Sequence, residues 1–265
     1  MIVIQPRGGL CNRMRAVDSA IALSEKLGKK LNVIWLLNYE CNCKFQDLFI
    51  VPKSVNRFIH FKSTKPLGLF YKALQLYYSY FRNYNSLDQK GTEAFIDKEK
   101  ALEEFTKYKK VFISTFSRFY PSLSPFRSFV PIKHLQEIID TYNVKNMVGV
   151  HIRRIENVQS VTHSPLERFV ECMKEEINKN SGIKFFVSTD DYKVEEYLRN
   201  LFPHRIISHK KKSFSRNSSR GVQDALIDLY CLSNCSKLIG SYWSSFTDTA
   251  WQINGIDQIT IRENL

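Results

Sequence analysis

The sequence has no apolar run long enough to cross a membrane as a helix, which takes about 20 residues. Its first residues, Met1 to Arg7, also lack a basic segment followed by an apolar core, which is the pattern of a secretory signal peptide. These two absences predict a cytoplasmic protein. Peripheral attachment at the inner face of the membrane is compatible with both.

The six cysteines lack the spacing of a metal site. Cys41 and Cys43 are separated by one residue, and no second CxxC or HxxxH pattern accompanies them, which excludes the common zinc motifs. Cys231 and Cys235 lie four residues apart on a predicted helix, where small buried thiols are common. We therefore expect structural thiols in a reducing compartment, with no metal ion, no cofactor and no disulfide.

Acidic residues are outnumbered, with 26 Asp and Glu against 39 Lys and Arg and a net charge of +13. Such a balance attracts nucleic acid, an anionic membrane surface or phosphorylated small molecules. The densest basic run, residues 209–216, is predicted to be a loop. No RRM, KH or helix-turn-helix signature is present, and the aromatic residues do not interleave with a continuous basic stripe. A nucleic-acid-binding protein is therefore an alternative and not the first hypothesis.

The first part of the chain has the pattern of a parallel α/β lobe. Apolar strands are predicted at residues 2–5 and 31–35, on either side of a helix that ends at Gly28. This β-turn-α-β unit is the building block of a parallel sheet. A further strand at 111–116 closes the lobe.

The second part alternates strands and helices after a Ser- and Pro-rich link at residues 117–131. Five strands in this pattern predict a doubly wound parallel sheet. We place the domains at 1–125 and 126–265. The five strands are predicted at residues 147–152, 184–188, 205–208, 237–240 and 258–261.

Residues 67–84 are dense in aromatic side chains, such as Phe70, Tyr71 and Tyr77, with Lys72 and Arg82 between them. One interpretation is a core helix with a half-exposed face. The other is a surface that docks a membrane or a sugar acceptor, because helices of aromatic and basic residues lie well at bilayer interfaces.

Polar residues that directly follow strands are the first candidates for a site, because ligands bind outside the carboxyl ends of such sheets. His151 to Arg154 end one strand, and the guanidinium groups of Arg153 and Arg154 match phosphate oxygens. Surface ion pairs are the alternative. Asp190 and Asp191 end the next strand, where they can serve in acid–base chemistry, bind a ribose or cap a helix.

Three further features point to a nucleotide. Asp228 lies near the apolar stripe of its helix, so its carboxylate needs a partner such as guanine N1–H and the 2-amino group, or a Lys or Arg. Ser244 and Ser245 stand at a strand-to-helix junction, which binds anions or simply caps the helix. The Gly8-Gly9 turn is also of a kind that approaches phosphates, although it is not a GxGxxG motif.

Four segments resemble, in chain order, the fucosyltransferases that use GDP-fucose. The run Gly8-Gly9-Leu10-Cys11-Asn12-Arg13 is similar to their glycine-rich opening, and residues 151–154 are similar to their HxRR motif. Residues 185–191 resemble a strand that ends in TDD, and residues 224–250 resemble the closing helix and Ser-Ser turn. The family includes α-1,6-fucosyltransferases, nodulation fucosyltransferases and protein O-fucosyltransferases.

The resemblance implies an α/β, GT-B-like fold of two Rossmann-like lobes with parallel sheets and a donor site in the cleft. It implies a GDP-fucose donor, inversion at the anomeric carbon and no metal requirement. His151 and Asp228 would recognise guanine, and Arg153 and Arg154 would hold the diphosphate. The remaining implied donor contacts are Gly8, Gly9, Asn12, Arg13, Ser244 and Ser245.

The chain departs from the family pattern in ways that leave the catalytic base open. Cys11 stands where the family usually has Gly, and Ile155-Glu156 stands where Thr-Asp commonly follows HxRR. Val161 lies near the spacing of the candidate base of the α-1,6 enzymes. The candidates here are Glu156, Asp190, Asp191 and His163, unless the reaction proceeds without an enzymic base.

We expect an inverting glycosyltransferase that moves fucose from GDP-fucose to a glycan or lipid-linked glycan, with a bacterial surface polysaccharide as the acceptor class. There are three alternatives. Two are a glycosyltransferase for another nucleotide sugar and a basic nucleic-acid-binding protein, and the third is an inactive module that only binds a sugar nucleotide. Arg153 and Arg154 favour an active enzyme, because fixed cations stabilise the charge that grows on the departing GDP.

Overall fold

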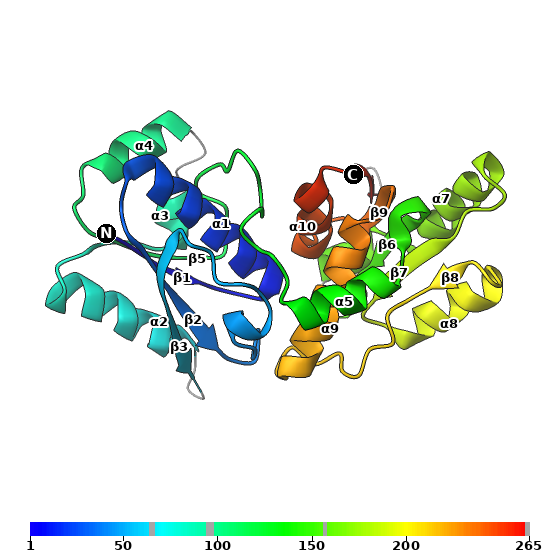
Figure 1. Cartoon of the computed structure of the whole chain (residues 1–265), viewed down its shortest axis with the longest axis horizontal. Helices are drawn as coiled ribbons and strands as arrows, with labels where there is room; N and C mark the ends of the chain where they lie inside the picture. Colours follow the sequence, from blue (N-terminus) through cyan, green and yellow to red (C-terminus); the bar gives the residue numbers. More distant parts are fainter. Residues whose placement is uncertain (64–66, 94–97, 156–157, 263–265) are drawn as a thin grey trace. The chain divides into compact units, whose positions relative to one another are not determined.

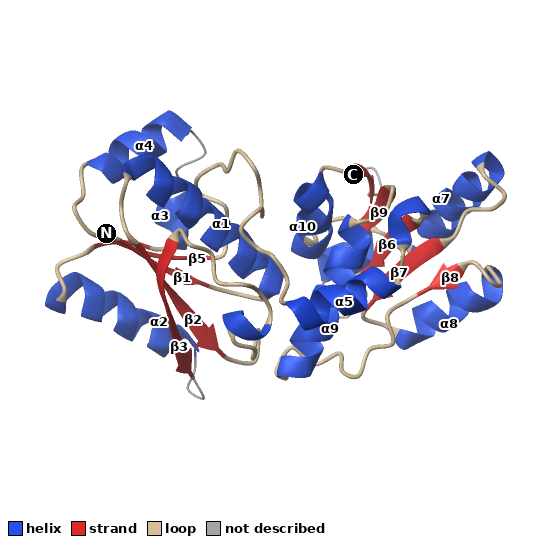
Figure 2. Ribbon diagram, in the orientation of Figure 1, coloured by secondary structure: helices blue, strands red, loops and turns tan. Residues whose placement is uncertain are grey.

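A computed structural model describes the chain except residues 64–66, 94–97, 156–157 and 263–265. The chain divides into two compact units. Each unit contains a five-stranded sheet whose strand pairs are all parallel, with helices packed on both of its faces (Figures 1 and 2). The units are Met1–Ile132 with Ser215–Gln223, and Lys133–Phe214 with Asp224–Leu265.

The sheet of the first unit has the strand order β3-β2-β1-β5-β4. All five residues of the central strand β1 are buried. The elements of the first unit are β1 (Ile2–Pro6), α1 (Leu10–Leu27), β2 (Leu31–Leu37), the 3-10 helix η1 (Phe45–Asp47), β3 (Val55–Lys62), α2 (Leu67–Leu76), the π-helix η2 (Tyr77–Phe81), β4 (Asn85–Leu87), α3 (Gln89–Glu93), α4 (Lys98–Thr106) and β5 (Val111–Thr115).

The two faces of this sheet carry different helices because successive side chains of a strand point to opposite sides. Val3, Ile34 and Phe112 form a buried cluster against Leu74 and Tyr78, which belong to α2 and η2. Helix α1 lies on the other face (Figure 1).

The sheet of the second unit has the order β10-β9-β6-β7-β8. The chain passes from β6 outward to β8 and then returns to the other side of β6 at β9, so the topological switch point lies between β6 and β9. Its elements are α5 (Lys133–Thr141), the 3-10 helix η3 (Val144–Asn146), β6 (Val148–Ile152), α6 (Val158–His163), α7 (Leu166–Lys179), β7 (Phe185–Thr189), α8 (Tyr192–Leu201), β8 (Ile206–Ile207), α9 (Ser219–Ser233), β9 (Lys237–Ser241), α10 (Ser245–Asn254) and β10 (Asp257–Ile261).

Alternation along β6 decides which side chains reach the site. Val148, Val150 and Ile152 pack in a core cluster with residues of α7 and α8. Gly149 and His151 point to the other face, toward α9 and α10. A Cβ on Gly149 would lie 3.1 Å from Leu232 Cδ2, so glycine lets α9 approach the sheet closely.

The strands and helices predicted for the two parallel sheets are confirmed to within a few residues, and the two-sheet α/β class is confirmed. The division into units differs from the predicted boundary at residue 125. The link belongs to the first unit because Phe129 packs on Phe49, and Phe126 N donates to Asp18 Oδ1 at 3.0 Å. Residues 215–223 join the same unit, where Asn42 N donates to Arg216 O at 2.9 Å.

The segment at residues 67–84 has a buried and an exposed face, as both sequence interpretations require. Tyr71 is buried, whereas Tyr80 is 81% exposed. Within the described ranges, no helix combines the length and apolar character needed to cross a bilayer. Burial raises the pKa of the Cys43 and Cys235 thiols to about 12, which makes them inert structural thiols.

Candidate active site

The carboxyl ends of β6 and β9 are tied together at the switch point of the second sheet. Ser241, the last residue of β9, accepts a hydrogen bond from Arg153 N at 2.9 Å. Its hydroxyl donates to His151 O at 3.3 Å. One serine therefore fixes the backbone on both sides of Ile152, where the HxRR segment leaves the sheet.

Asp190, which directly follows β7, binds the segment that carries the two arginines. Its Oδ1 accepts from Arg154 N at 2.7 Å, and its Oδ2 accepts from Ile155 N at 3.2 Å. The same Oδ2 lies 3.1 Å from Arg153 Nε. These charge-assisted contacts engage both carboxylate oxygens of Asp190 with the backbone and side chain of the arginine segment. Asp190 is thus placed to position the arginines.

Arg154 carries an unsatisfied donor. Its guanidinium lies over the Phe169 ring, 5.8 Å from the centroid, and its Nη1 donates to Arg153 O at 3.1 Å. Nη2 is buried and has no hydrogen-bond partner among the described residues. Burial lowers the pKa of Arg154, against the opposing effect of Asp190. A buried cationic donor without a partner is costly, and an anion bound beside it would satisfy it.

His151 is a buried, neutral imidazole. Its ring stacks on Phe246 with centroids 4.8 Å apart, and its Nδ1 lies 2.7 Å from Thr247 Oγ1. Burial lowers the pKa of His151 to about 3, with Arg153 and Lys211 acting in the same direction. A Cβ on Gly240 would lie 2.2 Å from Thr247 Cγ2, so the glycine at this position lets α10 bring Thr247 to the histidine.

The burial of His151 predicts a pH-dependent stability. Its pKa is about 3 in the folded chain against an ordinary 6.5, so between these values only the unfolded chain binds the proton. The free energy of unfolding is therefore expected to fall as the pH is lowered through this window, by about 1.4 kcal/mol per pH unit from this residue. Denaturant unfolding of wild type and His151→Asn at several pH values measures the difference.

Comparison with the variant isolates the histidine. Burial raises the pKa of Asp18 to about 6, so this carboxyl contributes the opposite slope between its ordinary 3.8 and 6. Asp18 is present in both proteins, and its contribution cancels in the difference. Parallel pH profiles for wild type and His151→Asn would contradict the expectation.

Asp228 presents a buried carboxylate oxygen that lacks a partner. Its Oδ2 accepts from Ser188 Oγ at 2.6 Å and lies 2.8 Å from Lys211 Nζ. Its Oδ1 is buried with no hydrogen-bond partner in the described part of the chain. Lys211 also donates to Thr189 O at 3.2 Å. Lys211 and Ser188 therefore hold the carboxylate through Oδ2, and Oδ1 is left to accept from a ligand.

Lys211 was not among the predicted site residues, because it lies in the basic run that predicted only a loop. Asp224 folds this loop onto α9: its Oδ2 accepts from Lys212 N at 2.8 Å, and its Oδ1 lies 3.0 Å from His209 Nε2. The signal in the sequence was the pair of aspartates one helical turn apart. Asp224 holds the loop backbone, and Asp228 forms an ion pair with Lys211.

The junction of β9 and α10 has the expected helix start. Ser244 is buried and is the N-cap of α10, and its carbonyl accepts from Asp248 N at 3.0 Å. Its hydroxyl makes no capping hydrogen bond, and Ser245 is the first helical residue. The N-terminus of a helix is a favourable place for an anion, and this one begins after the β9 end that Ser241 ties to β6.

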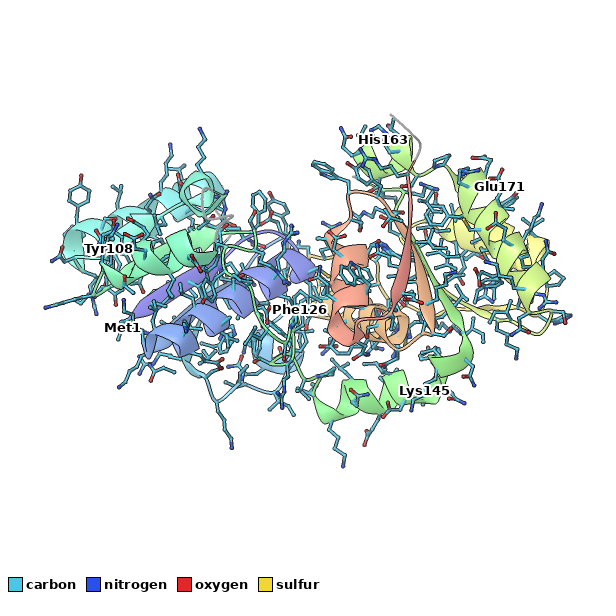
Figure 3. All side chains as sticks on the ribbon, turned by 90° about the horizontal axis from the view of Figure 1, so that it is seen from above. Met1, Tyr108, Phe126, Lys145, His163 and Glu171 are labelled. Atoms are coloured by element: carbon cyan, nitrogen blue, oxygen red, sulfur yellow. The ribbon has the colours of Figure 1, made fainter. Side chains whose placement is uncertain are left out.

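The candidate bases differ in what the structure places around them. Asp191 is the N-cap of α8 and accepts from Lys193 N at 2.9 Å. His163 ends α6, with its ring edge-on to Tyr242 at 5.8 Å, and is labelled in Figure 3. Glu156 lies outside the described residues. The carboxylates of Asp190 and Asp191 both accept hydrogen bonds from the backbone, which gives each residue a structural role.

The predicted donor contacts of the glycine-rich opening all lie in the first unit. Gly8 has φ 78°, a conformation that favours glycine. Arg13 is completely buried, donates from Nε to Gly8 O at 2.7 Å and from Nη2 to Asn38 Oδ1 at 2.9 Å. These hydrogen bonds tie Arg13 to the Gly8 turn and to Asn38, so Arg13 positions the turn. Gly9 precedes α1, and Asn12 lies in its first turn.

Among the described residues, no group of three or more His, Cys, Asp or Glu side chains gathers as a metal ion would require.

No protein-family model matches the sequence, and no curated protein matches it. Solved structures do. A NodZ α-1,6-fucosyltransferase soaked with GDP-fucose is 17% identical, with a TM-score of 0.64 over 95% of this chain and 92% of that chain. A mutant of Arabidopsis thaliana FUT1 in complex with GDP is 14% identical, with a TM-score of 0.63 over 99% and 70%. POFUT1 in complex with GDP-fucose is 12% identical, with a TM-score of 0.56 over 98% and 97%.

The fold is that of fucosyltransferases. This likeness confirms the GT-B-like class expected from the sequence, with two Rossmann-like lobes and parallel sheets. These similar structures come from the same groups of enzymes that the sequence motifs resemble, at sequence identities of 12% to 17%. The sequence motifs and the fold thus resemble the same group of enzymes, and the two resemblances rest on different observations.

Proposed function

We propose that the protein is an inverting glycosyltransferase that transfers fucose from GDP-fucose without a metal ion. The observation that carries the proposal is a pair of unsatisfied buried atoms on residues near the carboxyl ends of β6 and β7. Asp228 Oδ1 lacks a donor, and Arg154 Nη2 lacks an acceptor, within the described residues. A guanine supplies hydrogen-bond donors to Asp228, and a diphosphate supplies acceptor oxygens to Arg154.

Asp228 is anchored to Ser188 in β7, and Arg154 is anchored through its backbone to Asp190, which directly follows β7. A nucleotide bound at the carboxyl ends of β6 and β7 would present its base to Asp228 and its diphosphate to Arg154. His151, next to Ser188 in the sheet register, is the second candidate contact for the base.

The proposed chemistry needs positive charge where GDP departs. Fucosyl transfer breaks the bond between the anomeric carbon and a β-phosphate oxygen, and the acceptor hydroxyl attacks from the opposite face. The sugar passes through an oxocarbenium-like state while negative charge grows on the diphosphate. Arg153 and Arg154, with the start of α10 at Ser244 and Ser245, stabilise that charge by preorganised electrostatics.

The proton of the acceptor hydroxyl has fewer candidate receivers than the sequence suggested. Asp190 and Asp191 are assigned here to positioning Arg153, Arg154 and helix α8. Glu156 and His163 remain candidates, as does transfer without an enzymic base. The proposed acceptor is a glycan or a lipid-linked glycan, with a bacterial surface polysaccharide as the expected class on the basis of the sequence resemblance.

Calorimetric titration with GDP, UDP, ADP and short single-stranded DNA, in EDTA, tests the donor class. We expect selective binding of GDP, followed by EDTA-insensitive hydrolysis or transfer with GDP-fucose. GDP binding with no turnover of GDP-fucose would favour another GDP-sugar or an inactive module. Tight DNA binding without nucleotide preference would overturn the proposal and favour the nucleic-acid alternative.

A further inference from the structure

Helix α2 and the π-helical turn after it present apolar side chains to solvent. Leu69, Leu76, Tyr77, Tyr80 and Phe81 are exposed, and we call them the aromatic face. The exposed fractions of Tyr80 and Phe81 are 81% and 80%. Singly exposed apolar residues are ordinary, but a group of large ones along one helical segment marks an interaction surface.

The opposite side of the same segment is firmly packed. Tyr71 is buried, and Tyr78 stacks on Phe112 of β5 with ring centroids 4.7 Å apart and an interplanar angle of 7°. Tyr84 meets Tyr78 edge-on at 5.2 Å. Helix α2 thereby covers the sheet face opposite α1 (Figure 1). The aromatic face is held outward by a fixed helix, so its exposure is a feature of the folded unit.

The sequence around this segment carries charge of one sign. The sequence between Asp47 and Asp88 contains no acidic residue and six basic ones: Lys53, Arg57, Lys62, Lys65, Lys72 and Arg82. Lys72 and Arg82 are exposed on the segment itself. Lys110 adds a further charge at its end, because its Nζ donates to Arg82 O at 3.3 Å. Exposed apolar rings are therefore accompanied by ammonium and guanidinium groups.

We propose that the aromatic face docks on an anionic phospholipid bilayer. Tyr and Phe rings settle at the headgroup level of a membrane, and Lys and Arg are drawn to acidic lipids. A second copy of the chain would bring two positive faces together, which electrostatics disfavours. The positive charge of this segment favours an anionic surface over a neutral sugar, whose hydroxyl groups donate and accept hydrogen bonds without carrying charge. None of the five residues of the aromatic face is among those assigned to the donor.

Sedimentation of the full chain with lipid vesicles tests the proposal. We expect binding to vesicles of phosphatidylcholine with phosphatidylglycerol, weakening as salt is raised, and no binding to phosphatidylcholine alone. Tyr80→Ser with Phe81→Ser should lower the partition coefficient by about tenfold per ring. Lys72→Gln with Arg82→Gln should lower it by roughly fivefold per charge.

Matched controls come from elsewhere on the surface. Leu123 is 95% exposed, and Lys145 is exposed and labelled in Figure 3, so Leu123→Ser and Lys145→Gln remove an apolar group and a charge outside the face. Both should leave vesicle binding unchanged. GDP titration of every variant shows whether the fold and the donor site survive, which separates a failure here from a failure of the proposed function.

Three results would overturn the docking proposal. One is absence of binding to the anionic vesicles. Another is equal loss of binding in the control variants. The third is a dimer in analytical ultracentrifugation that Tyr80→Ser with Phe81→Ser dissociates, since that would identify a second copy as the occupant.

Discussion

Replacing Arg154 by alanine is expected to lower turnover of GDP-fucose by about 10²- to 10³-fold, the loss seen when one preorganised donor to a developing charge is removed. The reason is the buried Nη2 of Arg154, which has no partner in the described chain and is therefore available to the diphosphate. The loss should appear in kcat as well as in GDP affinity, because the charge on the leaving group is greatest in the transition state. Steady-state kinetics and calorimetry measure the two effects.

Two companion variants make the result specific. Arg154→Lys retains a charge but loses the planar fork, so it should recover only part of the activity. Arg168→Ala removes an exposed arginine of α7 that pairs with Glu171, and it should behave as wild type. Near-wild-type turnover of Arg154→Ala with an unchanged thermal midpoint would remove Arg154 from the diphosphate site.

Strands β6 and β7 of the second unit were predictable because each is short, fully buried and followed at once by polar residues. Strand β7 is fully buried over Phe185–Thr189 and is then followed by Asp190. In the first unit, β3 and β4 carried no such signal. Strand β3 lies at the sheet edge with a mixed burial pattern and an irregular register with β2, and β4 has only three residues. Edge position and brevity weaken the period on which sequence reasoning depends.

The position of a candidate residue was predictable where it follows from that residue's own strand or helix. His151, Arg153 and Asp228 lie at strand ends or on a helix face, so local pattern sufficed to nominate them. The contact of Lys211 with Asp228 and the burial of Arg13, which the family resemblance had nominated as a donor contact, depend on the tertiary fold. Lys211 lies in a basic loop that Asp224 draws inward, and Arg13 is buried by contacts with Leu36 and Asn38 of the neighbouring β2 region. Tertiary contacts decide whether a charged side chain is buried or exposed, and local sequence does not record them.

Replacing Asp228 by asparagine should weaken GDP binding by roughly 10- to 100-fold, the range for hydrogen bonds to a charged acceptor. Lys211 and Ser188 already donate to Oδ2, so the amide of asparagine must keep its oxygen toward them and turn its NH₂ toward the ligand. An NH₂ group facing guanine N1–H sets donor against donor. The weak binding of UDP and ADP, which lack this pair of donors, should change little.

Inosine diphosphate makes the base assignment quantitative, because it lacks only the 2-amino group of GDP. Wild type should prefer GDP over inosine diphosphate, and Asp228→Asn should narrow the preference. Asp257→Asn, an exposed carboxylate in β10, should leave it unchanged. A disrupted fold would weaken all nucleotides alike, whereas loss of guanine recognition changes their ratio. An equal loss for GDP, inosine diphosphate, UDP and ADP would therefore remove Asp228 from the base site, even if every affinity fell.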